Sequence, residues 1–304
     1  EQGVHEGGPK MIIYVVGRNF GHLSPCMAVI DAFQKIDREK IAIYAYKSTH
    51  RWLGKNISGD RVKIKTFTRA GMKNKKKKIL ARSRLIFHDW REEVAYLKQA
   101  RSKDRPIIAG MFHSDLAITK QDNKKTRKFK RQVVEIADKT TDIFFHMNIT
   151  PPRKKPNMKA KYVPIPIVAR KPDMSVAKVK KKLGIPEHEP FILVQMGGGT
   201  GPYKYKYIEE WYKKLNALKL DYHIVITSPL KGDTKFPFKK HIRVAPVFSN
   251  GANLVNAAEM VISKPGRGII YDCIALRKPL LLLPADTKER QVQNMMVKSG
   301  LTKF

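Results

Sequence analysis

Two short apolar segments, each followed directly by glycine, constrain the fold of this 304-residue chain more than any other feature. Residues 11–16 (MIIYVV) end at Gly17, and residues 191–196 (FILVQM) end at the run Gly197-Gly198-Gly199-Thr200-Gly201. An uninterrupted apolar run of this length is typical of a strand buried on both faces, as in a parallel sheet. The sequence therefore predicts two α/β units, each beginning with a buried strand and a glycine turn into a helix.

The pattern of apolar residues extends this prediction along the chain. In the first half we expect helices at 24–36 and 89–100, strands at 41–46, 62–67, 106–110 and 141–146, and an extended segment at 162–168. In the second half we expect helices at 207–218, 252–258 and 269–276, and strands at 223–227, 242–247, 260–262 and 280–283. The Pro- and Lys-containing segment 171–189 is the expected linker between an N-terminal unit, 11–170, and a C-terminal unit, 190–304.

Composition indicates the kind of partner. The chain has 61 Lys and Arg against 26 Asp and Glu, a net charge of +35. In heat-adapted proteins glutamate is enriched together with lysine, but here it is not. The excess of positive charge therefore favours a polyanionic partner, either nucleic acid or an anionic membrane surface. The two cysteines, Cys26 and Cys273, suggest neither a disulfide framework nor a metal cluster. No apolar run approaches the roughly 20 residues of a spanning helix.

A third glycine turn lies in the segment Ser263-Lys264-Pro265-Gly266-Arg267-Gly268, between an expected strand and an expected helix. Backbone N–H groups at such a turn can face a diphosphate. Asp272 follows in the helix, where its carboxylate can bind ribose hydroxyls. After the next strand, a polar loop carries Gln291 and Asn294. This order is typical of a site for a nucleotide sugar.

Four segments of the C-terminal half, in this order, resemble the nucleotide-sugar glycosyltransferases of the GT-B fold, and most of all the MurG-like group. They are residues 197–201, 245–248 (APVF), 263–272 and 289–294. The N-terminal half adds residues 17–25 (GRNFGHLSP), similar to the family's first glycine loop, and 163–166 (VPIP), similar to its segment before the interdomain linker. The resemblance implies two Rossmann-like domains with parallel sheets facing a cleft. It also implies a hexosyltransferase whose C-terminal domain binds the donor, most simply a UDP-sugar.

The resemblance also assigns donor contacts. Asp272 would bind the ribose hydroxyls, although glutamate is usual at this position, and Phe248 would lie near the base. Lys264 and Arg267 would pair with phosphate oxygens. The residues expected around the donor are Gly21, Gly198, Gly199, Thr200, Phe248, Lys264, Gly266, Arg267, Gly268, Asp272, Gln291 and Asn294.

Transfer of a sugar needs a base for the acceptor hydroxyl and compensation of charge on the departing diphosphate. His22 is the expected base because Gly21-His22 lies in a strand-to-helix turn. Asp115 could orient His22 or act as the base itself, and His113 is a rival. Direct attack from the opposite face would invert the anomeric carbon. The chain has no Asp-x-Asp motif, so we expect no metal and no cofactor.

Most of the basic runs lie in the N-terminal half, where this family binds its acceptor. The residues expected to contact a polyanion are Lys75, Lys76, Lys77, Lys78, Arg82, Arg84, Lys125, Arg127, Lys128, Lys130 and Arg131. The size of the charge narrowly favours DNA with modified bases, flipped out for glycosylation as by viral enzymes. The alternative is a lipid acceptor at an anionic membrane, with 79–80 and 85–87 as an interfacial apolar patch. The runs could also be simple solvated surface.

A hypothesis from another class is a non-catalytic nucleic-acid-binding protein on a GT-B scaffold, which would bind no nucleotide sugar. We expect a cytoplasmic location, in the host cytoplasm for a viral protein and at the membrane surface for a lipid acceptor. No obligate protein partner is expected. Residues 1–10 are an expected tail before Met11, and the chain ends at Phe304, before the C-terminal helices usual in this fold.

Overall fold

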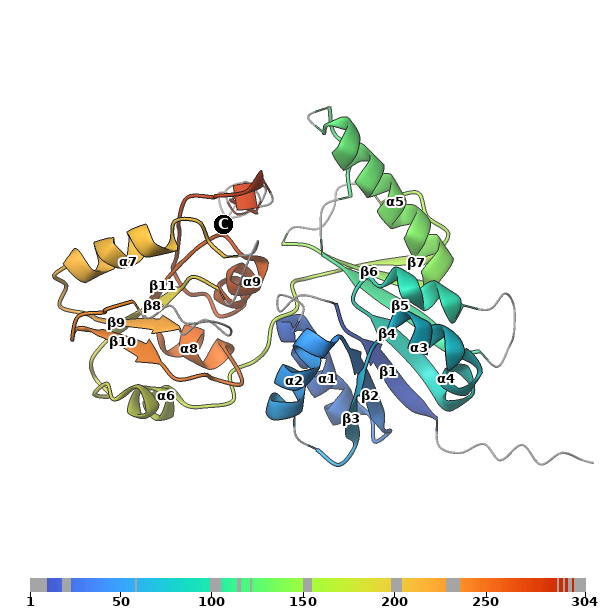
Figure 1. The fold of residues 1–304 in the computed structure, drawn as a ribbon, viewed down its shortest axis with the longest axis horizontal. Helices are drawn as coiled ribbons and strands as arrows, with labels where there is room; N and C mark the ends of the chain where they lie inside the picture. Colours follow the sequence, from blue (N-terminus) through green and yellow to red (C-terminus); the bar gives the residue numbers. More distant parts are fainter. Residues whose placement is uncertain are drawn as a thin grey trace, which may run out of the picture. The chain divides into compact units, whose positions relative to one another are not determined.

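The structure is a computed structural model with two compact units. They comprise residues 1–167 and 168–304 (Figure 1). The described residues are 10–17, 23–57, 59–98, 105–113, 116–120, 122–149, 155–197, 204–227, 236–288, 290–291, 293–294 and 297.

The first unit is built on a seven-stranded sheet in the order β3-β2-β1-β4-β5-β6-β7 (Figure 1). Every neighbouring pair is parallel. The strands are β1 (Met11–Val15), β2 (Ile41–Ala45), β3 (Val62–Thr66), β4 (Ser83–His88), β5 (Ile107–Phe112), β6 (Ile143–Met147) and β7 (Lys161–Ile165). Parallel neighbours require crossover connections, and these place helices on the faces of the sheet.

The helices of the first unit are α1 (Leu23–Ile36), α2 (Lys47–Asn56), α3 (Arg69–Asn74), α4 (Lys76–Arg82) and α5 (Lys124–Thr140), with a 3₁₀ turn, η2 (Glu92–Tyr96). Asn123 caps α5, because its side-chain oxygen accepts a hydrogen bond from the Thr126 amide. Val133 and Ala137 of α5 are buried against Phe112 and Phe144 of the sheet, which fixes the helix on that face.

Strand β4 was not predicted from the sequence, and it corrects two expectations. It lies between β1 and β5 at the centre of the sheet, with Ile86 fully buried and Phe87 nearly so. Residues 85–87 therefore form core rather than the interfacial apolar patch expected for a lipid acceptor. Of the helix expected at 89–100, the described residues 89–98 form only η2, and Trp90 takes a left-handed backbone conformation (φ 51°) directly after the strand, which a helix start would not allow.

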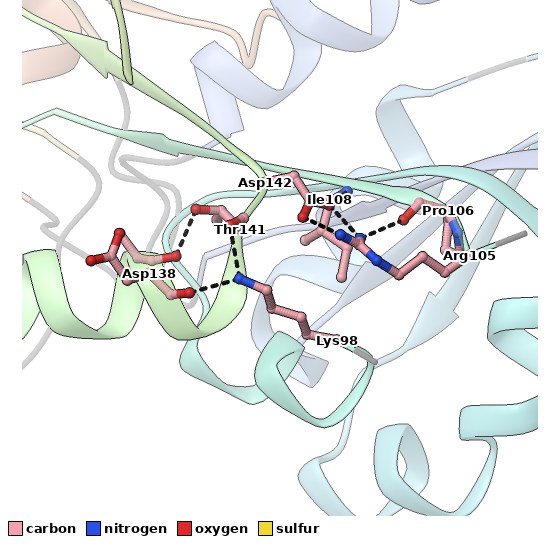
Figure 2. Close-up of polar contacts among 8 residues, drawn as sticks. Lys98, Arg105, Pro106, Ile108, Asp138, Thr141 and Asp142 are labelled. Carbon is pink, nitrogen blue, oxygen red and sulfur yellow. Dashed lines mark hydrogen bonds and ion pairs between the residues drawn. The ribbon is translucent and has the colours of Figure 1, made fainter. Parts of the chain in front are cut away.

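A polar cluster joins the amino ends of β5 and β6 on the first unit (Figure 2). The Arg105 guanidinium donates to both carboxylate oxygens of Asp142, at 2.5 Å each, and Asp142 also accepts from the Ile108 amide at 2.9 Å. The Lys98 ammonium donates to the carbonyls of Asp138 and Thr141, at 2.6 and 3.1 Å (Figure 2). A bidentate charge-assisted pair of this kind is among the stronger polar contacts in proteins, so these strand ends are firmly held.

The second unit is built on a five-stranded parallel sheet in the order β10-β9-β8-β11-β12. Apolar clusters cover both of its faces, one around Phe191 and Val261 and the other around Val194 and Tyr212. The elements are β8 (Phe191–Gln195), α7 (Ile208–Ala217), β9 (His223–Thr227), β10 (Ile242–Ala245), α8 (Ala252–Ala257), β11 (Met260–Ser263), α9 (Arg267–Ala275) and β12 (Leu280–Leu282).

The segment expected to be a linker contains a packed helix, α6 (Val176–Leu183). Its Val179 and Leu183 are buried in the apolar cluster around Phe191, so α6 belongs to the second unit. Gly184 ends the helix in the left-handed conformation that glycine adopts without strain (φ 67°). The predicted fold class, two α/β units with parallel sheets, is confirmed.

Candidate active site

Each sheet has a topological switch point at the carboxyl ends of two central strands. In the first unit the chain leaves β1 toward β2 and β3 on one side, and leaves β4 toward β5, β6 and β7 on the other. In the second unit the same reversal occurs between β8 and β11. Open α/β sheets bind their ligands at this point, outside the carboxyl ends of the strands. The two glycine turns predicted from the sequence begin here, at Gly17 and at Gly197.

At the second switch point, Lys264 lies directly over Gly197. Gly197 follows β8 with φ 81°, and a Cβ atom built on it would lie 2.4 Å from Lys264 Cε and 3.0 Å from its Nζ. The backbone conformation therefore favours glycine here, and any larger residue would also displace the end of the lysine side chain. Ser263 joins the two strand ends, because its hydroxyl donates to the Gln195 carbonyl at 2.6 Å. The structure thus brings Lys264 to the start of the Gly197 turn.

Helix α9 begins at this same edge without a side-chain cap and without an acidic residue in its first turn. The first N–H groups of a helix have no partner within the helix and carry the positive end of its dipole, so they favour an anion. A Cβ atom on Gly268 would meet no atom of the described residues within 4 Å, and one on Gly266 would make only ordinary contacts with them. Packing within the protein does not require these glycines, whereas a closely approaching ligand would.

Asp272 lies one turn beyond Gly268 on the same face of α9, because residues four apart on a helix are neighbours. It is only 8% exposed, and burial raises its pKa to about 7. Within the described part of the chain, its Oδ1 is buried and accepts no hydrogen bond. A buried carboxylate oxygen without a donor is costly for the protein alone. Hydroxyl groups of a ligand would satisfy it.

Three other side-chain oxygen atoms of the second unit are also buried without a partner among the described residues. They are the Tyr271 hydroxyl and the side-chain carbonyl oxygens of Gln293 and Asn294. Buried polar groups in proteins are nearly always hydrogen-bonded, so such a group of exceptions is a sign of a ligand site. Gln293 was missed from the sequence, where Gln291 was preferred. Gln291 is exposed, and only burial distinguishes the two.

Some of the remaining predicted donor residues are described by the structure, and others are not. Phe248 is partly buried against the apolar cluster of the second unit, with the Lys182 ammonium 5.7 Å from its ring centre. Arg267, in the first turn of α9, is close enough to lower the pKa of Tyr271 against the larger raising effect of burial. Gly21, Gly198, Gly199 and Thr200 lie outside the described residues.

At the first switch point, the described residues include a buried carboxylate that the sequence analysis missed. Asp89 follows β4 and accepts hydrogen bonds from the Tyr14 hydroxyl at 2.6 Å and from the Gly17 amide at 3.4 Å. The predicted base His22 and its predicted partner Asp115 lie outside the described residues. His113 follows β5, and its ring stacks on Phe112 with 6.2 Å between ring centres.

Of the residues predicted to contact a polyanion, most are exposed, and three bind other groups of the protein. Lys75, Lys77, Lys78 and Arg82 are exposed, Lys76 is partly so, and none pairs with a carboxylate of the described residues. Burial and then the cations Lys75, Lys78, Arg82 and Lys63 lower the pKa of Lys65 on β3, so these side chains form one concentrated positive surface. Lys125, Lys128 and Arg131 are exposed along α5.

Three of the predicted contacts are used within the protein instead. Lys130 is buried and its ammonium binds the Asp122 carboxylate, at 2.9 Å, and the Ala117 carbonyl. Arg127 donates to the Asp122 carbonyl at 2.8 Å. Arg84 pairs with Asp37 and with Glu39. These three side chains hold local structure in place, which a count of positive charge cannot reveal.

No group of three or more His, Cys, Asp or Glu side chains within the described residues could hold a metal ion. None of the helices described here is both long enough and apolar enough to cross a bilayer.

No protein-family model matches the chain. The structure is similar to UGT2 of Phytolacca americana, solved with UDP-2-fluoro-glucose and pterostilbene, with a TM-score of 0.65 and 11% identity over 97% of this chain and 84% of that one. It is similar also to UGT89C1 of Arabidopsis thaliana, solved with quercetin, with a TM-score of 0.62 and 9% identity over the same shares. The fold is GT-B.

In sequence, the chain is 24% identical over 306 aligned residues to a transferase of Fusobacterium nucleatum. That protein is named a UDP-N-acetylglucosamine–N-acetylmuramyl-(pentapeptide) pyrophosphoryl-undecaprenol N-acetylglucosamine transferase, and the match spans 95% of this chain and 82% of the relative. The resemblance to GT-B glycosyltransferases of the MurG-like group, inferred from the sequence, is confirmed. The comparisons give no support to DNA as a partner.

Proposed function

We propose that this protein is a glycosyltransferase that takes a sugar from a UDP-sugar and transfers it to a hydroxyl group of a lipid-linked acceptor. The observation that carries the proposal is the edge of the second sheet. There Lys264 lies over Gly197, helix α9 begins directly after Gly266 without a side-chain cap, and Asp272 is buried with an oxygen that has no partner among the described residues. Cation, helix N-terminus and carboxylate are the groups that a nucleoside diphosphate needs.

In this proposal the diphosphate lies against the first turn of α9. The Lys264 ammonium and the Arg267 guanidinium compensate its charge, together with the backbone amides at the helix start. Asp272 accepts the ribose hydroxyls one turn further along the helix. Gln293 and Asn294, whose side-chain oxygens are buried without a partner among the described residues, supply further acceptors. The bond from sugar to phosphate breaks as charge grows on the departing UDP, and these same groups stabilise that charge without a metal ion.

The acceptor hydroxyl loses its proton to a base, for which we retain His22, oriented by Asp115. Attack from the face opposite the UDP inverts the anomeric carbon. The anomeric configuration of the product, read by proton NMR from a fresh reaction, tests this step. A product that keeps the donor's configuration would contradict direct attack.

One observation supports a lipid acceptor over DNA, and a second is compatible with it. The relative from Fusobacterium nucleatum is named for a pyrophosphoryl-undecaprenol acceptor. The exposed lysines of α3 and α4 also provide a positive surface on the first unit, which suits an anionic bilayer. DNA, favoured by charge alone, suits that surface as well, and the acceptor experiment distinguishes the two.

The donor is tested by thermal shift with UDP-, GDP- and TDP-sugars. A UDP-sugar is expected to raise the melting temperature of the wild type, and Lys264→Ala and Asp272→Ala are expected to reduce the shift. Lys278→Ala is the matched control, since Lys278 follows the other end of α9. A protein that no nucleotide sugar stabilises would contradict the proposal and favour a non-catalytic scaffold.

The acceptor surface is tested by vesicle pelleting and by gel shift with duplex DNA at matched salt. Replacing Lys75, Lys77 and Lys78 by glutamine is expected to weaken binding to phosphatidylglycerol vesicles by roughly 100-fold, since each lysine near an anionic surface contributes about 1 kcal/mol. The matched control replaces Lys213, Lys219 and Lys240, which are exposed on the second unit. Binding to DNA without binding to vesicles would overturn the lipid acceptor.

A further inference from the structure

A short segment at the start of the second unit is hydrogen-bonded to the turn that carries Phe248. The first unit ends at residue 167, and residues 170–174 follow before α6. The turn, residues 246–251, lies between β10 and α8. Five hydrogen bonds join residues 170–174 to residues 249–253, and both segments lie within the described part of the chain. We call this set of contacts the clamp.

Asn253 is the centre of the clamp. It lies in α8 and is 1% exposed. Its Oδ1 accepts the Asp173 amide at 2.9 Å and the Met174 amide at 3.1 Å, and its Nδ2 donates to Asp173 Oδ1 at 2.7 Å. Because backbone amides can only donate, these contacts fix the orientation of the Asn253 side chain. One buried side chain therefore holds the backbone of two residues of the segment.

Asn250 and Arg170 bind the turn itself to the segment. Asn250 is also 1% exposed, and its Nδ2 donates to the Lys171 carbonyl at 2.8 Å. The Arg170 guanidinium donates to the Ser249 carbonyl at 2.9 Å. Ser249 and Asn250 directly follow Phe248 in the chain. The backbone beside Phe248 is thus held by residues from the start of the unit.

The charge of Asp173 is compensated within the clamp. Burial alone would raise the pKa of Asp173, but hydrogen bonds from Asn253 and Asn250 and the charge of Arg170 hold it below its ordinary value. The carboxylate is therefore ionised at neutral pH, which strengthens its hydrogen bond from Asn253. A buried polar network of this kind is rigid while its members are bonded, and removal of one member leaves its partners unpaired.

The turn lies at the edge of the sheet where the donor site is proposed. Strands β10, β9 and β8 are mutually parallel, so all three end at the edge where Gly197 follows β8. Phe248 and Met174 pack on the same apolar cluster, around Phe191. Nucleobases stack on aromatic side chains, and Phe248 is an aromatic residue in a turn at this edge. The clamp therefore fixes the position of a candidate base-stacking side chain.

We propose that Asn253 and Asn250 are positioning residues of the donor site, which hold the turn so that Phe248 stacks on the nucleobase. The inference rests on the proposed function, in which the donor is a UDP-sugar. Neither asparagine touches the nucleotide, because both act through the backbone of the turn. Loss of the clamp therefore weakens the contribution of the base to binding and leaves the contribution of the diphosphate.

Isothermal titration calorimetry with two ligands tests this role. One ligand is UDP, and the other is methyl ribofuranoside 5-diphosphate, which keeps the ribose and the diphosphate but has no base. Stacking of a base on an aromatic side chain contributes roughly 5- to 150-fold to affinity. Asn253→Ala is expected to raise Kd for UDP roughly tenfold, within that range, and to change Kd for the base-free ligand less than about twofold.

An exchange of side chains provides a rescue that a loss of folding could not imitate. Asn253→Asp keeps an acceptor for the two amides but places a second carboxylate against Asp173, so Kd for UDP is expected to rise roughly tenfold. Combining Asn253→Asp with Asp173→Asn restores a donor and an acceptor across the contact. The double variant is expected to bind UDP within about threefold of wild type, and a double variant as weak as Asn253→Asp would contradict the clamp.

Asn216→Ala is the matched control, since Asn216 holds residues 236–240 before β10, at the opposite edge of the sheet. Its Nδ2 donates to the Pro237 carbonyl at 2.9 Å, and its Oδ1 accepts the Lys239 amide at 3.1 Å. This variant is expected to lower the melting temperature and to leave Kd for both ligands unchanged. A loss of UDP affinity equal to that of Asn253→Ala would overturn the inference.

The outcomes separate this inference from the proposed function. Unchanged UDP affinity in Asn253→Ala, or an equal loss for UDP and for the base-free ligand, would overturn the inference alone. A wild type that binds UDP but transfers no sugar would refute the proposed transfer and keep the positioning role. A wild type that does not bind UDP would overturn both.

Discussion

Gly197→Ala is the sharpest perturbation of the candidate donor site, because it places one methyl group between the glycine turn and Lys264. The new Cβ would lie 2.4 Å from Lys264 Cε, far inside van der Waals contact. The end of a lysine side chain moves easily, so the steric cost is small. The ammonium, however, has to leave its place over the turn.

Two separate losses follow. The backbone at residue 197 has φ 81°, and holding a non-glycine residue in left-handed conformation costs about 1–2 kcal/mol. That loss appears in the free energy of unfolding, measured by urea denaturation. The second loss appears in UDP affinity. A hydrogen bond to a charged group contributes about 1.5–3 kcal/mol, so displacing the Lys264 ammonium should raise Kd roughly 10- to 100-fold.

A double-mutant cycle with Lys264→Ala separates the two losses. In the Lys264→Ala background, Gly197→Ala should still lower the free energy of unfolding but should no longer weaken UDP binding, measured by isothermal titration calorimetry. An equal loss of UDP affinity in both backgrounds would refute the reasoning, because the methyl group would then act on the ligand or the backbone and not through Lys264.

Three further outcomes are expected. Binding of UDP should release protons near pH 6.5, because ribose hydroxyls favour ionised Asp272, whose pKa is about 7 in the free protein. Calorimetry in buffers of different ionisation enthalpy measures this proton release. The same release in Asp272→Asn would contradict the assignment. The free energy of unfolding should fall as the pH rises from about 4 to 7, because folded Asp272 and Asp89 retain protons that the unfolded chain has lost. Urea denaturation at several pH values should show a shallower fall for Asp272→Asn. An unchanged slope would show that Asp272 is not the group responsible. Ile86→Ala should lower the free energy of unfolding by about 2–5 kcal/mol, as expected for a buried strand residue, and leave vesicle binding of the folded protein unchanged. Weaker vesicle binding with full stability would instead support the hypothesis that residues 85–87 contact the membrane.

Much of the fold could be predicted from local pattern. The strands β1 and β8 were evident because an apolar run ends at glycine, and the parallel architecture followed from their spacing with helices. Strand β4 was missed because it follows a lysine-rich stretch and its apolar run is only three residues long. Its place at the centre of the sheet depends on pairing with β1 and β5, which no local window contains.

Only part of the candidate site could be predicted from the sequence, because the rest depends on contacts between distant segments. Lys264 and Asp272 were identified by their order after a strand, and the structure brings Lys264 to Gly197 across more than sixty residues of chain. Asp89 carried no motif. Its significance comes from burial and from its contact with Gly17, both of which require the folded sheet. Burial likewise distinguishes Gln293 from Gln291.

Transfer of radiolabelled sugar from UDP-N-acetylglucosamine tests the central claim most directly. Wild-type protein with vesicles containing the pyrophosphoryl-undecaprenol acceptor should form labelled lipid and release UDP in equal amounts, and Asp272→Ala should reduce both. The predicted result is that wild type binds UDP and forms labelled lipid, whereas the variant does not. Wild type that neither binds UDP nor releases it from any UDP-sugar would contradict the account.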